Sequence, residues 1–524
     1  MPFKSFTPLL KGGGLAILFF LLLFAGGSYQ SYPGMFDSLQ LEVSSVLHDE
    51  HTQWMVFLCL VIYLNIFLFL GFVMESKPTM YCRISNPLAG ATGYAVWSSR
   101  YARNFWLACT MFLNSAIYAI RYQPSSLAIT LLAGVVVGKG LMLWADIESK
   151  NRQFRILDIC VVLLIGLLLL ASVWSTDGRI YAYQAHTRWT GPWKNPNIFG
   201  LLMGTGIVLV VGLAAHYARR LDQTFNYPVG VDHRLARQLS MYCFCTLLCC
   251  LAVILMGRAL LNSYSRGAWM STSCGLSYLF YQAALRKQKA EVEKVEALAA
   301  RVESGEQGAR TKISISFRLL QLFEAFVFFR ISLISRLQRN RFPFLVVFCS
   351  AAVLIFSYFR QTDWHPARRA ASAVNPVDFS WRNRITAWDG GWQMIAEHPW
   401  FGTGWNQPEL LYEYYYLHPK LIEGAAIEMN DYLMLGATLG IPALFCFGMY
   451  LWLSFTNKLE IGNWQSEIVE MNWLQKSCRA GAIVLLVGLW FDGGLFILAT
   501  AATFWILLEL GNVHHECTRI NSND

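Results

Sequence analysis

Long apolar stretches recur along the chain of 524 residues, and they constrain its fold more than any other feature of the sequence. A helix of about 20 apolar residues crosses the hydrocarbon core of a lipid bilayer. By that length, the sequence predicts an all-α membrane protein with about twelve transmembrane helices. The predicted spans are residues 12–28, 53–74, 105–120, 126–145, 156–174, 197–216, 239–260, 268–285, 342–359, 431–454, 480–491 and 495–510.

Composition and charge agree with a membrane protein. Charged residues make up 14% of the chain, against about 25% of a typical soluble protein, and the mean hydropathy is +0.39. The net charge of +9 does not require a nucleic-acid partner, because basic cytoplasmic loops give membrane proteins the same excess. Four cysteines (Cys243, Cys245, Cys249 and Cys250) cluster in an apolar run without a nearby His or carboxylate, so we expect them to pack in the core and bind no metal.

The distribution of basic residues predicts the topology. With the N-terminus in the cytoplasm, the long basic loops all fall on the cytoplasmic side, including the one with Lys458, Lys476 and Arg479, and the acidic loop 30–52 falls outside. Both termini are then cytoplasmic, and a large outer loop, residues 360–430, connects the ninth and tenth helices. Residues 313–337 are apolar but carry four charged side chains. Each would cost about 2.5–3.5 kcal/mol at the membrane centre, which favours a helix in the cytoplasmic interface over a further span.

This topology divides the chain into three parts. Residues 1–285 hold the first eight membrane helices, residues 286–341 form a charged cytoplasmic linker with the interfacial helix, and residues 342–524 hold the last four helices and the outer loop. Residues 381–443 are unusually dense in Trp, Tyr, Arg, Glu and His for a segment outside the spans. Much of any chemistry is therefore expected there.

Arginines on the predicted outer side run against the usual charge bias and need a reason. Arg266 begins a predicted helix beside Gly267, and Arg384 precedes a short amphipathic pattern. The two could converge on one anion, because a guanidinium offers a planar fork of donors that suits phosphate oxygens. The alternative is that each side chain extends to lipid headgroups. For Arg382 the two readings are equally balanced.

Several short motifs occur together in a characteristic order. They are WKNPNIFG from Trp193, SRGA from Ser265, RITAW from Arg384, HPWFGTG from His398, NDYL from Asn430 and LGIPAL from Leu439. In these motifs and in its predicted helices, the chain resembles the O-antigen ligase and O-antigen polymerase superfamily of bacterial membrane glycosyltransferases. The resemblance covers roughly residues 193–444.

The resemblance implies an activity in cell-envelope polysaccharide biosynthesis. Such enzymes transfer a glycan from undecaprenyl diphosphate to an acceptor on the outer leaflet of the bacterial inner membrane, without metal or cofactor. In ligases of lipopolysaccharide biosynthesis the acceptor is the lipid A–core, and in relatives it is another repeat unit or a protein Ser or Thr. The implied partners are the lipid-linked donor, a lipid or glycan acceptor and membrane lipids, with no nucleic acid.

The resemblance also implies roles for individual residues. Arg266 and Arg384 would hold the diphosphate leaving group on the periplasmic side. Substrate contacts are expected from further residues in or beside the motifs, namely Lys194, Asn197, Arg382, Asn430 and Asp431.

One position departs from the family pattern. Relatives carry a His directly before the Asn that matches Asn430, as the proposed base for the acceptor hydroxyl, and this chain has Met429, whose thioether cannot take a proton. Glu428 could substitute if shielding from water raises its pKa, and His418 is a second candidate. The alternatives are that Glu428 only caps the following helix, that His418 is an ordinary loop residue, or that activity is lost.

Two alternatives to a ligase remain open at this point. An O-antigen or exopolysaccharide polymerase, or a protein O-oligosaccharyltransferase, has the same sequence features. A lipid-linked glycan transporter, which is not an enzyme, would place charges along a water-filled path within its spans. Because the predicted spans are nearly free of charge, the sequence favours transfer at the outer face over passage through the membrane.

Overall fold

The computed structural model describes most of the predicted helices. The described residues are 17–23, 55–64, 89–121, 126–148, 156–173, 182–183, 186–225, 233–303, 379–405, 411–416, 430–455, 473–491 and 494–512. The predicted span 342–359, the interfacial segment 313–337, and the residues His418, Glu428 and Met429 lie outside them.

The described part of the chain is helical apart from one antiparallel pair of two-residue strands, β1 (Ala182–Tyr183) and β2 (His186–Thr187). The α-helices are α4 (Ala89–Arg121), α5 (Ser126–Glu148), α6 (Ile156–Val173), α7 (Pro196–Phe225), α8 (His233–Asn262), α9 (Arg266–Glu303), α14 (Phe379–Glu397), α16 (Asp431–Leu439), α17 (Ile441–Phe455), α18 (Trp473–Gly488) and α19 (Leu498–Leu510). Two further helical segments are residues 17–23 and Met55–Leu64, and two short helical turns are η3 (Gly191–Trp193) and η5 (Tyr412–Tyr416).

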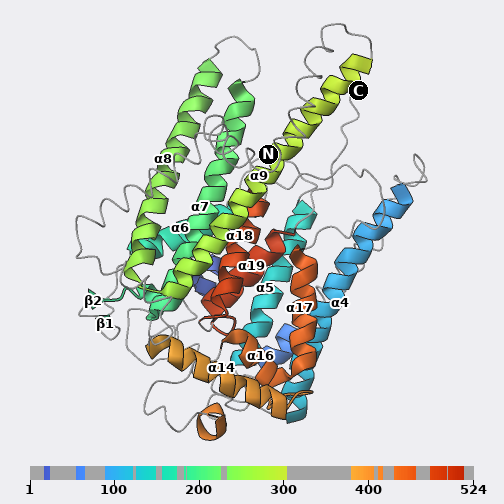
Figure 1. The fold of residues 1–524 in the computed structure, drawn as a ribbon, viewed down its shortest axis with the longest axis vertical. Coiled ribbons are helices and arrows are strands. Elements are labelled where there is room, and N and C mark those ends of the chain that lie inside the picture. The colour runs from blue at the N-terminus through green and yellow to red at the C-terminus, as the bar shows by residue number, and fades with distance from the viewer. Residues whose placement is uncertain are drawn as a thin grey trace, which may run out of the picture.

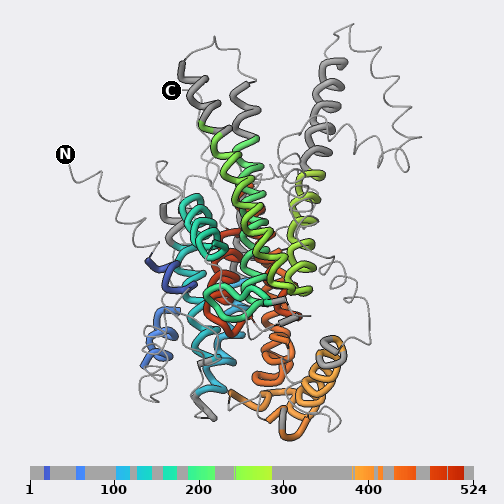
Figure 2. The backbone as a smooth tube through the Cα atoms, turned by 90° about the vertical axis from the view of Figure 1, so that its left-hand side faces the viewer, coloured from blue at the N-terminus to red at the C-terminus, as the bar shows by residue number. Residues whose placement is uncertain are grey.

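Most of these helices run lengthwise and pack into one bundle, and α14 lies across its lower end (Figures 1 and 2). Helices α7 and α9 begin at that end, which we call the α14 end. Helix α19 packs against α5, and α18 packs against α7 and α9. These contacts place α18 and α19 in the interior, with α4 and α17 together on one side.

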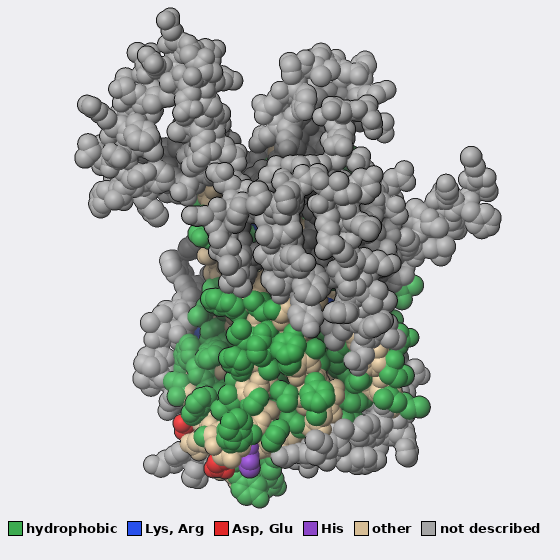
Figure 3. All heavy atoms as spheres, turned by 90° about the vertical axis from the view of Figure 1, so that its right-hand side faces the viewer, with side chains coloured by type: hydrophobic (Ala, Val, Ile, Leu, Met, Phe, Trp, Pro, Cys, Tyr) green, Lys and Arg blue, Asp and Glu red, His purple; other side chains and the backbone are tan. Residues whose placement is uncertain are grey.

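Two described helices are long and apolar enough to cross a bilayer, namely Pro196–Ala218 and Phe244–Asn262. Shorter apolar helices include Leu127–Leu143 and Leu157–Val173. Exposed hydrophobic side chains cover one face of the described bundle, with Asp, Glu and His near its lower end (Figure 3). The exposed hydrophobic residues of the described helices include Phe112 of α4 and Trp452 of α17. The helical class and the apolar surface fit a membrane protein, and the count of twelve spans stays a prediction.

Glycines bring the central helices into close contact. Gly134 and Gly138, one turn apart on α5, both face Trp505 of α19. A Cβ at Gly138 would lie 2.8 Å from the Trp505 carbonyl oxygen, which is closer than a carbon atom can approach. Gly200 and Gly204 likewise bring α7 onto α9. Small residues at a spacing of four allow helix backbones to approach in membranes, where packing replaces the hydrophobic effect between helices.

The predicted span 431–454 is two helices rather than one. Gly440 separates α16 from α17 with a φ of +85°, and the Ile441 N–H donates to the Pro399 carbonyl at 2.7 Å. A Cβ at Gly440 would lie 2.4 Å from the Trp400 carbonyl oxygen, so only glycine fits. The nine residues of α16 rise about 14 Å, less than half the thickness of the bilayer core.

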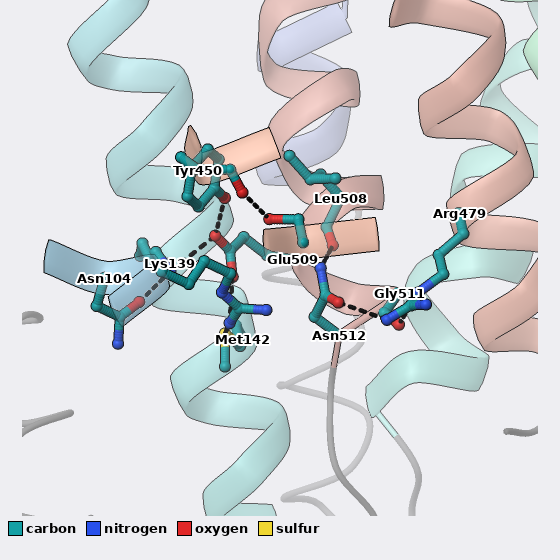
Figure 4. A network of polar contacts seen from close by, with 11 residues as sticks. Asn104, Lys139, Met142, Tyr450, Arg479, Leu508, Glu509, Gly511 and Asn512 are labelled. Atoms are coloured by element: carbon teal, nitrogen blue, oxygen red, sulfur yellow. Dashed lines mark hydrogen bonds and ion pairs between the residues drawn. The ribbon is translucent and has the colours of Figure 1, made fainter. Parts of the chain in front are cut away.

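A buried charge cluster lies between the helices, contrary to the expectation that the spans are nearly free of charge (Figure 4). Glu509 of α19 pairs with Lys139 of α5 at 2.8 Å and with Arg103 of α4 at 3.5 Å, and it accepts a hydrogen bond from the Tyr450 hydroxyl of α17. Lys139 also donates to Asn104 at 2.7 Å. Pairing lowers the cost of these charges among packed helices. The correction is that both Lys139 and Glu509 lie inside predicted spans.

A second correction concerns Lys476 and Arg479, which the topology assigned to a cytoplasmic loop. Both are buried in α18. Arg479 donates to the Gly511 carbonyl at 3.0 Å and to the Asn512 side chain at 2.6 Å (Figure 4). These contacts join the beginning of α18 to the end of α19, because the guanidinium satisfies carbonyl groups that a helix end leaves without partners.

The close packing of α5 on α19 can be tested with one methyl group. We expect Gly138→Ala to lower the free energy of unfolding by about 1–3 kcal/mol, because the added Cβ meets the Trp505 backbone, which cannot move aside. Gly166→Ala is the matched control, since nothing lies within 4 Å of a Cβ there and alanine is the better helix former. Thermal unfolding of the purified protein measures both. Equal stability of the two variants would contradict this packing.

Candidate functional site

Three of the predicted site residues lie in one hydrogen-bonded unit at the α14 end. The segment that carries Lys194 and Asn197 is joined to the turn between α8 and α9, where Arg266 begins α9. Arg188 links them: its Nε donates to the Ser263 carbonyl at 2.8 Å and its Nη2 donates to the Asn197 Oδ1 at 2.7 Å. Sequence reasoning assigned no role to Arg188, because its partners are 75 and 9 residues away.

Local structure explains why this unit forms. The Asn195 side chain accepts from the Asn197 N–H at 2.9 Å and caps α7. Lys194, before it, has a φ of +54° and closes η3 through its own N–H. Ser265 caps α9 by accepting from the Ala268 N–H at 3.3 Å. Arg266, the first residue of α9, is then 6% exposed at the helix start.

Helix α14 brings Arg384 to the turn that follows α18. Trp381, Arg384 and Trp388 share one face because they are spaced by three and four residues. Arg384 lies over the Phe491 ring at 5.8 Å, and the Trp381 ring is 6.3 Å from the same ring. Arg382 lies on α14 as well, and its side chain is outside the described part of the structure.

The HPWFGTG and LGIPAL motifs form one structural unit. The Thr403 and Gly404 N–H groups donate to the Ala437 and Thr438 carbonyls at 2.8 and 3.0 Å, at the end of α16. Gly402 has a φ of +60°, and a Cβ there would lie 2.3 Å from the Thr438 carbonyl carbon. Both motifs therefore fix how α14 joins α16, and this explains their glycines without a substrate.

Asn430 and Asp431 hold the beginning of α16 against the α18–α19 connection. The Asp431 carboxylate accepts the N–H groups of Gly494 and Leu495 at 2.7 and 2.8 Å, and its own N–H donates to the Leu489 carbonyl at 3.1 Å. The Asn430 Oδ1 accepts the Leu433 N–H at 2.8 Å, so Asn430 is the helix cap, a role that the sequence had offered to Glu428.

Contacts connect the two arginine-bearing units at the α14 end. Gly200 of α7 packs against Ser265, directly before Arg266. The next residue, Leu201, packs on Gly488 at the end of α18. Phe491, three residues further, lies under Arg384. Arg266 and Arg384 thus belong to elements that meet around the end of α18, although their sequence positions are more than a hundred residues apart.

Two tyrosines of η5 pack beside α14. Burial, reinforced by a hydrogen bond to Glu397, raises the pKa of Tyr416 to about 12, and its hydroxyl donates to Glu397 at 2.6 Å. Burial, with the Asp389 charge nearby, also raises the pKa of Tyr412 to about 12. Both hydroxyls keep their protons at neutral pH, so each can donate a hydrogen bond but neither is suited to act as a base.

Two further features of the described residues are the placement of their metal-ligating side chains and their buried donors without an acceptor. Among the described residues, no three His, Cys, Asp or Glu side chains gather as a metal site would require. Cys249 is buried in α8, and Cys245 and Cys250 are partly buried there. Within the described part of the chain, several buried side-chain donors have no acceptor, and they include Trp388 Nε1 on α14 and Asn430 Nδ2. A buried donor without an acceptor costs about 1–3 kcal/mol.

Comparison with known proteins identifies one domain. Residues 314–448 match the family model described as O-Antigen ligase. The match includes α14 and α16, with Arg384, Asn430 and Asp431. Lys194, Asn197 and Arg266 come earlier in the chain and lie outside the match. No curated protein and no solved structure matches the chain significantly.

Asp431 has structural contacts that can be tested apart from substrate binding. We expect Asp431→Ala to lower the free energy of unfolding by about 2–4 kcal/mol, because two backbone N–H groups lose a charged acceptor. Asp431→Asn retains an oxygen at this position and should lose less. Thermal unfolding without substrate measures the effect. A stable Asp431→Ala variant that only binds substrate poorly would contradict the structural role.

Proposed function

Because residues 314–448 carry a domain of the O-antigen ligase family, we propose that the chain is a glycosyltransferase of the O-antigen ligase type. It transfers a glycan from undecaprenyl diphosphate to an outer-leaflet acceptor, such as the lipid A–core. It lies in the bacterial inner membrane with both termini in the cytoplasm and the α14 end in the periplasm. The observation that carries the proposal is that Arg384, inside the matched domain, and Arg266, outside it, belong to elements meeting around one turn.

The proposed reaction is a single displacement at the sugar. The acceptor oxygen forms a bond to the anomeric carbon, the bond from that carbon to the diphosphate oxygen breaks, and a base receives the hydroxyl proton. The leaving group carries the developing negative charge. Guanidinium groups held on helices stabilise that charge in the transition state without having to reorganise, which is the main source of catalysis in a preorganised site. Arg266 and Arg384 have this role in the proposal.

The remaining predicted residues have supporting roles in the proposal. Lys194 and Asn197 lie in the unit that Arg188 joins to the α9 start, so they can contact the same anion or the first sugar. Arg382, also on α14, is proposed to contribute a positive charge to substrate binding. Asn430 contributes a side-chain donor, and Asp431 acts mainly by holding the turn. The exposed apolar flanks of the bundle allow the carrier lipid to approach from the bilayer.

A transporter is less well supported than an enzyme, because the charges among the helices are paired with one another and buried. Charges do occur among the helices, but Lys139, Arg103 and Glu509 pair with one another and are almost fully buried. A substrate path needs charges that face water. A polymerase or a protein O-oligosaccharyltransferase differs from a ligase only in its acceptor and shares the proposed site.

The two arginines provide the test of this function. We expect Arg266→Ala and Arg384→Ala each to abolish glycan transfer in cells that lack the wild-type chain, with normal membrane levels. Lysine at either position should restore transfer only in part, because it keeps the charge and loses the planar fork. Arg258→Ala is the control, since Arg258 is exposed and lies over the Trp189 ring. Wild-type transfer by either arginine variant would remove that residue from the site.

The proton acceptor is tested at the loop that carries Met429. If Glu428 or His418 is the base, Glu428→Gln or His418→Gln should reduce transfer by at least about 100-fold. Binding of the lipid-linked donor should persist, because the arginines hold the diphosphate. Met429→His should partly rescue Glu428→Gln if the rest of the site is intact. Full activity in both Gln variants would show that neither residue is the base.

A further inference from the structure

Two of the buried N–H groups that have no acceptor among the described residues lie at the α14 end. The Trp388 Nε1–H and the Asn430 Nδ2–H are buried, and in the described structure neither has a hydrogen-bond acceptor. Buried donors in proteins are nearly always paired, so each such exception requires a reason. A ligand that brings oxygen atoms is one of the standard reasons.

Both donors lie beside the same turn as Arg384. The Trp388 ring is 5.5 Å from the Trp490 ring, and Trp388 follows Arg384 by one helical turn on the same face of α14. Asn430 reaches the turn through its neighbour Asp431, whose N–H donates to the Leu489 carbonyl. The two donors and one guanidinium are therefore gathered around residues 489–491.

The fold alone would be served equally well by residues without these N–H groups. Packing of Trp388 against Trp381 and Trp490 uses the aromatic ring, which phenylalanine also offers. The capping of α16 uses the Asn430 Oδ1, and aspartate caps a helix as well as asparagine does. In both cases the N–H group is the part that the described contacts leave unused.

We propose that the Trp388 Nε1–H and the Asn430 Nδ2–H bind oxygen atoms of the lipid-linked donor, next to the Arg384 guanidinium. This rests on the proposed function and extends it to two neutral donors. Phosphate and sugar oxygens share the chemistry that an N–H group recognises. Neutral donors suit this place because a carboxylate at position 430 would repel a diphosphate, whereas the amide attracts it. Both residues are binding residues and take no part in proton transfer.

The test removes each N–H group while keeping the shape of the side chain. Trp388→Phe keeps an aromatic ring, and 3-benzothienylalanine at position 388 keeps both fused rings and replaces only the N–H with sulfur. Asn430→Asp keeps the capping oxygen and replaces the amide nitrogen, and Asn430→Ser removes the amide while still capping the helix, without adding a negative charge. Trp392→Phe is the matched control, since Trp392 is on the same helix and 60% exposed. The full-length variants in lipid nanodiscs are titrated with undecaprenyl diphosphate, and glycan transfer is measured in cells.

We expect each N–H deletion to reduce undecaprenyl diphosphate affinity, or glycan transfer, by about tenfold or more, with thermal stability equal to or above that of the wild type. Weaker binding of undecaprenyl diphosphate assigns the donors to phosphate oxygens. Reduced transfer with unchanged affinity for undecaprenyl diphosphate assigns them to the sugar. If Trp388→Phe fails to fold, the benzothienyl variant decides for Trp388, and if Asn430→Asp fails to fold, Asn430→Ser decides for Asn430.

Unchanged affinity and unchanged transfer in the folded variants overturn the inference. The outcome is distinguishable from failure of the proposed function. If Arg266→Ala and Arg384→Ala abolish transfer while the N–H deletions match Trp392→Phe, the function stands and the two donors are only unpaired groups. If the arginine variants transfer normally, the proposed function itself fails.

Discussion

The contact of the Asp431 carboxylate with the backbone of Gly494 and Leu495 organises the candidate site. It fixes the beginning of α16 to the connection between α18 and α19, whose preceding turn then receives the aromatic face of α14. A carboxylate that accepts two backbone N–H groups forms charge-assisted hydrogen bonds, which are stronger than neutral ones. The position of Arg384 therefore depends on the Asp431 contact, which involves no residue of α14. Asp431 can fix the geometry of the candidate site without touching a substrate.

Charged side chains lie near both ends of α19. At its end, Glu509 is enclosed by two cations and a tyrosine, and these contacts join four helices. At the α14 end, Arg266 and Arg384 belong to elements that meet around the turn after α18. Replacing one partner of a buried pair leaves an uncompensated charge and costs about 3–5 kcal/mol. The Glu509 cluster is thus suited to holding the four helices together.

Sequence reasoning predicted the helices best where a continuous apolar run defines them. The bounds of α6 differ by one residue from the prediction, and α5 begins at the predicted residue. Helices α8 and α9 extend further than predicted, because polar residues continue a helix beyond the apolar part that hydropathy detects. The break at Gly440 could not be predicted, since it depends on the close approach of the Trp400 carbonyl from a segment 40 residues earlier.

The site itself was predictable only in part. Residue types and motif order made Arg266 and Arg384 candidates, which they still are, and the resemblance agrees with the match of residues 314–448. The role of Arg188 and the burial of Lys476 depend on tertiary contacts between distant segments, which no local pattern contains. Glycines of HPWFGTG and LGIPAL are required by close backbone packing, and the sequence alone does not distinguish this requirement from a role in substrate binding. Asp431 shows the limit clearly: an acidic residue in a family motif predicts a substrate contact, and the structure gives its carboxylate backbone partners.

Because the proposed site is divided between two chain segments, its geometry depends on how the helices pack. Arg384 and position 429 lie inside the matched residues. Arg266 lies outside them, and its place in the proposed site depends on Gly200 and Gly204, which bring α7 onto α9, and on Leu201, which packs on Gly488. Close glycine packing tolerates no added side chain without displacing a helix, and a displacement of about 1 Å at a catalytic group can cost about 100-fold in rate. The apolar contacts between α7, α9 and α18 are therefore as necessary to the proposed transfer as the charged residues, although none of them would touch a substrate.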